Sequence, residues 1–184
     1  CGLGTIGLLL LMFLVEKRGT ENIYIIGNKN FQKEMCIKLG LNEENYCDMK
    51  SEDPKQWIMN KTSGRGVDIY FECVGKPETV NQAIELTTPG GKLQLVGNPA
   101  SDMNIPQNVY WKILRNQLTV LGTWNSSFTR ESSDDWHYVV DKLSKNLINP
   151  EIVITHRFDL EKLEDGLKIM RDKTEDYVKI MVTQ

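Results

Sequence analysis

The sequence lacks the features of several common protein classes. It has no excess of positive charge, because 22 lysines and arginines face 25 aspartates and glutamates, giving a net charge of −3. A nucleic-acid-binding domain normally has a basic excess, so we expect no nucleic acid as partner. The apolar run at residues 8–15 is too short to span a bilayer and has no basic segment before it. We therefore expect neither a membrane span nor a signal peptide.

Cysteine and histidine are too few and too scattered to predict a metal site. The cysteines at positions 1, 36, 47 and 73 form no C-x-x-C pair, and neither His137 nor His156 has a second ligand at metal-binding spacing. Cys73 has no histidine nearby in sequence to activate it as a nucleophile. We predict no metal ligand and no catalytic residue in this chain. Four unpaired thiols are typical of a reducing compartment, which favours the cytoplasm.

Glycine is concentrated at the start of the chain, in the segment GLGTIG at residues 2–7. This G-x-G-x-x-G spacing is typical of the turn between a strand and a helix in dinucleotide-binding proteins. The first glycine makes the tight turn, the second lets a diphosphate approach the backbone, and the third lets helix and strand pack closely. The N–H groups of the helix start would bind the diphosphate. A purely structural turn and an S-adenosylmethionine-dependent methyltransferase are the alternatives.

Beyond the glycine loop, short apolar segments alternate with helical segments. This pattern predicts an α/β fold with a parallel sheet covered by helices on both faces. A polar stretch at residues 125–133 indicates a boundary between a dinucleotide-binding domain, 1–130, and a C-terminal segment, 131–184. We expect helices at residues 5–18, 30–39, 54–61, 77–86, 109–116, 134–145 and 160–171, and strands at 23–26, near 46, and at 67–74, 92–96, 118–121, 152–155 and 177–182, with a turn at 89–91.

The end of the second strand bears on the choice of cofactor. NAD-dependent enzymes usually place an acidic residue there for the ribose hydroxyls, but this strand is followed by Gly27, Asn28 and Lys29. Gly27 leaves room for a 2′-phosphate, and Lys29, assisted by Lys33, supplies the opposite charge. NADP is therefore favoured over NAD, and a solvated lysine is the plain alternative.

Three segments resemble the cofactor-binding half of the zinc-dependent medium-chain alcohol and polyol dehydrogenases. They are GLGTIG at 2–7, DIYFECVGKPETVNQAIELTTPGGKLQLVGNP at 68–99, and ITHRFDLEKLEDGLKIMRDK with VKIMV within 154–182. The segment VYWKILRNQLTVLGTWNSSF at 109–128 is most similar to the galactitol-1-phosphate 5-dehydrogenase branch of that family. The resemblance covers essentially the whole chain. It implies a Rossmann-type, doubly wound parallel sheet in the order 3-2-1-4-5-6 and a C-terminal segment that returns to the catalytic domain.

The resemblance also implies cofactor contacts and a partner. The diphosphate would meet the glycine loop, and the adenosine ribose would meet the end of the second strand. Residues 73–75 would flank the adenosine side, and those at 96–98 and 122–124 would reach the nicotinamide. The implied cofactor-binding residues are Gly2, Gly4, Thr5, Ile6, Gly7, Gly27, Asn28, Lys29, Cys73, Val74, Gly75, Val96, Gly97, Asn98, Gly122, Thr123 and Trp124. The edge strand Leu118–Leu121 resembles the edge through which family dimers pair, which implies a homodimer.

The activity implied by the resemblance belongs to a longer protein. Family members oxidise a secondary alcohol bound to a catalytic zinc and pass hydride to the nicotinamide. Their zinc ligands lie mainly upstream of the glycine loop, which implies zinc only in a full-length protein and an inactive 184-residue chain. The implied substrate is a polyol or a sugar-alcohol phosphate. The alternatives are a non-catalytic dinucleotide-binding module and a dehydrogenase for another alcohol, such as sorbitol or threonine.

The family sheet order also predicts a gap in the sheet. The strand that feeds the glycine loop would be central, and this sequence begins at the loop itself, so we expect a piece of a longer protein whose sheet is divided into two half-sheets. Each unpaired, buried backbone group at such a gap costs about 1–3 kcal/mol. One hypothesis places the apolar segment YVKIMV, residues 177–182, in the vacant position.

Overall fold

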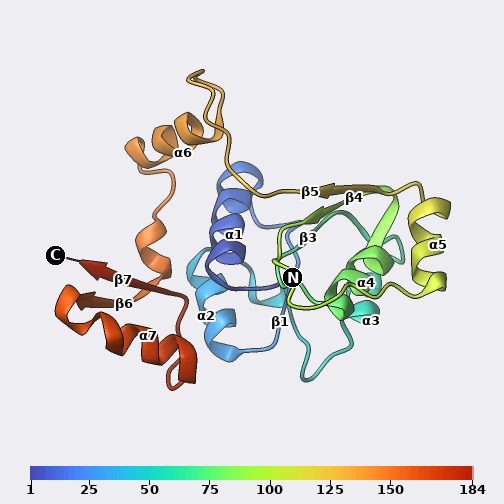
Figure 1. Ribbon diagram of the computed structural model, residues 1–184. Helices are drawn as coiled ribbons and strands as arrows, with labels where there is room; N and C mark the ends of the chain where they lie inside the picture. Colours follow the sequence, from blue (N-terminus) through green and yellow to red (C-terminus); the bar gives the residue numbers. More distant parts are fainter. Residues whose placement is uncertain (184) are drawn as a thin grey trace.

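The computed structural model describes residues 1–183 and shows an α/β fold, as predicted (Figure 1). Helices and parallel strands alternate along the chain. The helices are α1 (Thr5–Arg18), α2 (Asn30–Lys38), α3 (Pro54–Lys61), α4 (Pro77–Leu86), α5 (Gln107–Arg115), α6 (Asp135–Ser144) and α7 (Leu163–Asp172). The strands are β1 (Ile25–Gly27), β2 (Tyr46–Asp48), β3 (Val67–Glu72), β4 (Thr87–Leu95), β5 (Thr119–Gly122), β6 (Ile154–Asp159) and β7 (Lys179–Thr183).

The described strands form three separate parallel sheets. β1 pairs with β2, β4 lies between β3 and β5, and β6 pairs with β7. The carboxyl ends of neighbouring parallel strands meet at one edge of a sheet, so the loops after β3 and β4 lie beside each other. The predicted division into two half-sheets, β1-β2 and β3-β4-β5, is confirmed.

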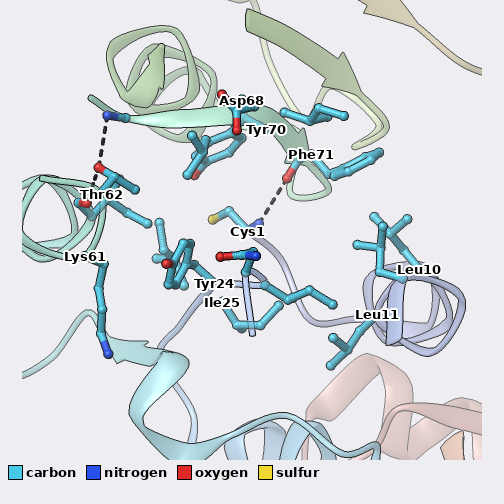
Figure 2. Close-up of a pocket in the computed structure, with 18 of the residues that line it drawn as sticks. Cys1, Leu10, Leu11, Tyr24, Ile25, Lys61, Thr62, Asp68, Tyr70 and Phe71 are labelled. Atoms are coloured by element: carbon cyan, nitrogen blue, oxygen red, sulfur yellow. Dashed lines mark hydrogen bonds between the residues drawn. The ribbon is translucent and has the colours of Figure 1, made fainter. Parts of the chain in front are cut away.

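A cavity of about 930 Å³ separates the two half-sheets (Figure 2). Tyr24 and Ile25 line it from one side and Tyr70 and Phe71 from the other. The amino group of Cys1 donates to the carbonyl of Phe71 at 3.0 Å, and the carbonyl of Cys1 accepts from the N–H of Cys73 at 2.9 Å. These two bonds straddle one residue of β3 as the bonds of a parallel ladder do. Cys1 is thus aligned as a strand residue beside β3.

The C-terminal strand β7 does not enter this cavity. It pairs with β6 from Ile154 opposite Lys179 to Asp159 opposite Thr183. The hydroxyl of Thr155 helps to fix this register, because it donates to the carbonyl of Lys179 at 3.2 Å and accepts from the N–H of Val178 at 3.1 Å. The hypothesis that residues 177–182 fill the gap is therefore wrong.

β4 begins earlier than predicted. Its register against β3 jumps from Val67 opposite Thr87 to Ile69 opposite Lys92, so residues 89–91 form an irregular, bulged part of a longer strand. The N–H of Gly90 is bonded to the carbonyl of Asn116 at 2.7 Å. The turn predicted at 89–91 is wrong because this pairing involves residues far apart in sequence.

The C-terminal segment packs against α1 rather than standing apart. Ile148, Val153 and Val178 belong to the same buried cluster as Leu8 and Leu11 of α1. An ion pair of 2.7 Å between Lys142 and Glu16 adds a polar link between α6 and α1. The domain boundary at 125–133 stays a prediction. Within residues 1–183, the structure contains no helix with the length and apolar character needed to cross a membrane.

Candidate functional site

The glycine loop has a separate steric reason for each of its glycines. Gly2 has φ of +91°, and a Cβ atom there would lie 2.7 Å from the carbonyl carbon of Cys73. A Cβ atom on Gly7 would overlap the carbonyl oxygen of Gly2. Gly4 is different, since a Cβ atom there would meet nothing within 4 Å. The first and third glycines are therefore needed for packing, and the second opens on free space.

That free space lies at the N-terminus of α1. Gly4 is the N-cap residue, no side chain caps the helix, and the first turn holds no acidic residue. The first N–H groups of a helix have no partner within it, and its dipole makes this end positive. The hydroxyl of Thr5 is directed to the carbonyl of Val178 at 2.8 Å, so it does not cap this end of α1. The helix end is suited to bind an anion.

The loops after β3 and β4 touch each other backbone to backbone. A Cβ atom on Gly75 would overlap the carbonyl oxygen of Asn98, and one on Gly97 would overlap the amide nitrogen of Gly75. The N–H of Ala100 donates to the carbonyl of Gly75 at 3.1 Å. With Gly2 packed on Cys73, three backbone loops meet around the start of α1.

A second cavity, of about 480 Å³, brings four predicted site residues together. Ile6 lines it from α1, Val96 from the end of β4, and Gly122 and Thr123 from the end of β5. A volume of this size is typical of a small-molecule or cofactor pocket. By contrast, Trp124 is 80% exposed and does not line this cavity. Of the predicted residues 122–124, Trp124 is thus the one that does not line this cavity.

The end of β1 is closed to a side chain by a tyrosine. A Cβ atom on Gly27 would overlap the hydroxyl oxygen of Tyr46 and lie 2.8 Å from Cδ1 of Leu3. Tyr46 donates to the carbonyl of Lys29 at 3.3 Å. Burial is the main cause that raises the pKa of Tyr46 to about 12, so the phenol stays protonated. A side chain at position 27 would therefore displace the phenol of Tyr46, whichever cofactor binds.

Both lysines near this strand end already have acidic partners. Nζ of Lys29 lies 3.7 Å from a carboxylate oxygen of Asp176, and Nζ of Lys33 lies 2.8 Å from one of Glu43. Asn28 beside them is exposed. The predicted NADP preference relied on the positive charge of these two lysines. The carboxylate of Asp176 comes from the C-terminal segment and could not be placed there from sequence.

The thiols and imidazoles do not form a reactive or metal-binding group. Burial raises the pKa of Cys73, which opposes a thiolate nucleophile at this position. Nδ1 of His137 lies 2.8 Å from Oδ1 of Asp134, and Nε2 of His156 lies 3.4 Å from Oε2 of Glu175. Among the residues that the structure describes, no three His, Cys, Asp or Glu side chains are grouped to hold a metal ion. The residues that the structure describes therefore do not fit a catalytic zinc.

The most informative residue missed from the sequence is Glu72. It ends β3 and is 1% exposed, and its carboxylate accepts hydrogen bonds from the N–H groups of Val74 and Gly75 and from the hydroxyl of Thr79. A glutamate within an otherwise apolar strand end could have indicated such a role. A buried carboxylate needs several donors to offset its desolvation.

The comparisons with known proteins agree with this arrangement. A family model described as zinc-binding dehydrogenase matches residues 5–145, more than half of the chain. The chain therefore belongs to the zinc-binding dehydrogenase family, and the predicted relationship to zinc-dependent medium-chain dehydrogenases is confirmed.

Individual curated relatives are similar to this chain at low sequence identity. The chain is 27% identical to an L-threonine 3-dehydrogenase of Bacillus subtilis (strain 168), covering 92% of this chain and 46% of the relative. It is 26% identical to a galactitol 1-phosphate 5-dehydrogenase of Escherichia coli (strain K12), covering 91% and 47%. The chain thus spans about half the length of the curated relatives it matches.

Solved structures share the fold. The galactitol-1-phosphate dehydrogenase of Escherichia coli superposes with a TM-score of 0.83 at 24% identity, over 96% of this chain and 50% of that one. A zinc-binding dehydrogenase from Sinorhizobium meliloti 1021, described as putative and bound to NADP, superposes with a TM-score of 0.82 at 24% identity, over 100% and 51%. These likenesses establish the Rossmann-type dehydrogenase fold.

Proposed function

We propose that this chain is the dinucleotide-binding part of an oxidoreductase. The full-length protein would transfer a hydride between a secondary alcohol of a polyol or sugar-alcohol phosphate and the nicotinamide ring of NAD(P). In the oxidative direction the alcohol loses a hydride to the nicotinamide and a proton to a base, and becomes a ketone. The 184-residue chain would bind the dinucleotide without turning it over.

One observation supports this proposal most strongly. The backbone loops at Gly2, Gly75 and Gly97 pack around the N-terminus of α1, where Gly4 opens on free space. Backbone N–H groups and a positive helix end suit a diphosphate. The cavity of about 480 Å³ bordered by Ile6, Val96 and Thr123 would take the nicotinamide end.

We propose NADP rather than NAD as the preferred dinucleotide. Gly27 has no carboxylate to oppose a 2′-phosphate, and a side chain there would displace the hydroxyl of Tyr46. Lys29 is more than half exposed and carries the compensating charge, although Asp176 shares it. The preference should therefore be modest, since an exposed ion pair contributes at most about 1 kcal/mol.

The substrate and zinc belong to the full-length protein. The relative named for galactitol 1-phosphate supports a sugar-alcohol phosphate, and the relative named for L-threonine supports an amino-alcohol as the second candidate. Because the described residues do not fit a zinc ion, zinc and its ligands would come from residues outside this chain. No step of the reaction is assigned to this chain's side chains.

The exposed strand β5 supports the proposed homodimer. Every residue of Thr119–Gly122 is exposed, and β5 pairs with β4 along one edge. A free strand edge of this kind can pair with the same edge of a second copy. The four cysteines are free of disulfides, which suits the proposed cytoplasmic location.

Fluorescence titration tests the proposal. The purified chain is titrated with NADPH and with NADH, with S-adenosylmethionine as the control ligand. Saturable binding of both dinucleotides, tighter for NADPH, is expected, together with no alcohol-dependent reduction of NADP. Binding of S-adenosylmethionine alone would contradict the proposal, and tighter binding of NADH would contradict the cofactor preference.

A further inference from the structure

Glu72 joins two loops that are 20 or more residues apart in sequence. Its carboxylate holds the loop after β3: Oε1 accepts from the N–H of Val74 at 2.9 Å and from the N–H of Gly75 at 3.0 Å, and Oε2 accepts from Gly75 at 3.2 Å. Its main-chain carbonyl holds the loop after β4, accepting from the N–H of Val96 at 2.8 Å and of Gly97 at 2.9 Å.

A hydroxyl completes this network. Thr79, in the first turn of α4, donates to Oε1 of Glu72 at 2.8 Å and accepts from the N–H of Lys76 at 3.3 Å. The start of α4 is therefore fixed to the same carboxylate. A carboxylate suits this position better than an amide because both of its oxygens accept hydrogen bonds, whereas the NH₂ group of glutamine would face the N–H of Gly75.

We propose that Glu72 is the positioning residue of the dinucleotide site. It sets the loops at Gly75 and Gly97 against each other and so fixes the backbone surface offered to the cofactor. Glu72 is 1% exposed and so acts through the loops, without touching the ligand. The inference rests on the proposed dinucleotide function and adds to it the residue that controls affinity.

The test is a comparison of two buried carboxylates. Glu72→Gln is compared with Asp134→Asn, because Asp134 is 3% exposed and likewise holds a loop, accepting from the N–H groups of Thr129, Arg130 and His137. Asp134 lies at the start of α6, away from the glycine loop (Figure 1). The two variants therefore lose similar hydrogen bonds at different places.

NADPH titration by fluorescence gives the first readout. In Glu72→Gln the charge is gone and an NH₂ group faces the N–H of Gly75, which is expected to raise the NADPH dissociation constant by roughly tenfold. Asp134→Asn should stay within about twofold of the unmodified chain. Equal affinities of Glu72→Gln and the unmodified chain would overturn the proposal. If Glu72→Gln does not fold, Thr79→Val is used in its place. A smaller rise of the NADPH dissociation constant is then expected, and an unchanged dissociation constant would overturn the inference.

Amide hydrogen exchange without ligand gives the second readout, which does not depend on the proposed function. Glu72→Gln should speed exchange at Val74 and Gly75, whose N–H groups bond the carboxylate. The main-chain carbonyl that holds Val96 and Gly97 is unchanged, so exchange there should rise through the backbone contact between the loops at Gly75 and Gly97. Faster exchange in the first loop alone would overturn the coupling. An unmodified chain that binds neither NADPH nor NADH would instead overturn the proposed function.

Discussion

The hydroxyl of Tyr46 occupies the space that a side chain at Gly27 would need. The same hydroxyl donates to the carbonyl of Lys29 at 3.3 Å, so one phenol contacts both Gly27 and Lys29 in the turn after β1. Tyr46 is 6% exposed, and its partner Gly27 is buried. The end of β1 is thus closely packed, and a side chain at Gly27 would have to displace the phenol of Tyr46.

Gly27→Asp should therefore destabilise the fold instead of converting the cofactor preference. Overpacking and a buried carboxylate together are expected to lower the free energy of unfolding by about 1–3 kcal/mol. The matched variant is Gly27→Asp with Tyr46→Leu, in which the phenol is gone. Urea unfolding should show that the double variant loses less than the sum of its single variants. A Gly27→Asp chain as stable as the unmodified chain would contradict this packing.

Asp176→Asn should strengthen NADPH binding relative to NADH. The substitution removes the carboxylate 3.7 Å from Nζ of Lys29, leaving more of the positive charge for a 2′-phosphate. Both side chains are more than half exposed, so a change of about two- to fourfold is expected, decreasing as salt is raised. The control Asp141→Asn makes the same change of charge in an exposed pair with Lys145, at the end of α6, and should leave both affinities unchanged. An equal effect on NADH and NADPH would argue against a role for Lys29 at the ribose.

Ionised Asp134 contributes to the free energy of unfolding, and this contribution is lost at acid pH. Burial opposes its ionisation, but hydrogen bonds from the N–H and ring of His137 and from the N–H of Thr129 outweigh it and lower the pKa of Asp134 from 3.8 to about 2. A lowered folded-state pKa contributes stability above pH 4 that is lost as pH falls towards 2. Asp134→Asn should therefore be less stable at pH 7, with the difference shrinking between pH 4 and 2 in thermal unfolding. A constant difference would contradict this.

Amide exchange should reveal the cavity between the half-sheets. β4 is paired on both sides, whereas β1 and β3 each border the cavity along one edge. The N–H groups of β4 are expected to exchange slowest, and those of β1 and β3 that face the cavity markedly faster. Equal protection in β1, β3 and β4 would show that the cavity is closed in solution.

Local patterns were enough to predict most elements of the fold. Glycine and proline mark the ends of several helices, and the helix at residues 5–18 begins and ends as predicted. The bulge at residues 89–91 and the pairing of β7 with β6 were missed, since both depend on partners far along the chain. Periodicity reports which face is apolar, but it does not report which strand lies beside another.

The residues of the candidate site could likewise be predicted only where a local sequence pattern points to them. Gly2, Gly75 and Gly97 could be chosen because close backbone approach requires glycine, and the structure places these loops in contact. The pairing of Lys29 with Asp176 joins residues 147 positions apart, and no local pattern predicts it. Long-range electrostatic pairs of this kind depend on the tertiary fold, as does the role of Glu72.

The central claim is that the N-terminus of α1 holds the diphosphate of a dinucleotide, and Gly4→Val tests it most directly. A side chain at Gly4 meets nothing within 4 Å, so the variant should fold, with a loss of about 1 kcal/mol from the weaker helix cap. The valine would stand in the space where the diphosphate must approach. Calorimetric titration with NADPH should show binding to the unmodified chain and at least about tenfold weaker binding to folded Gly4→Val. Equal affinities of the two folded chains would contradict the account.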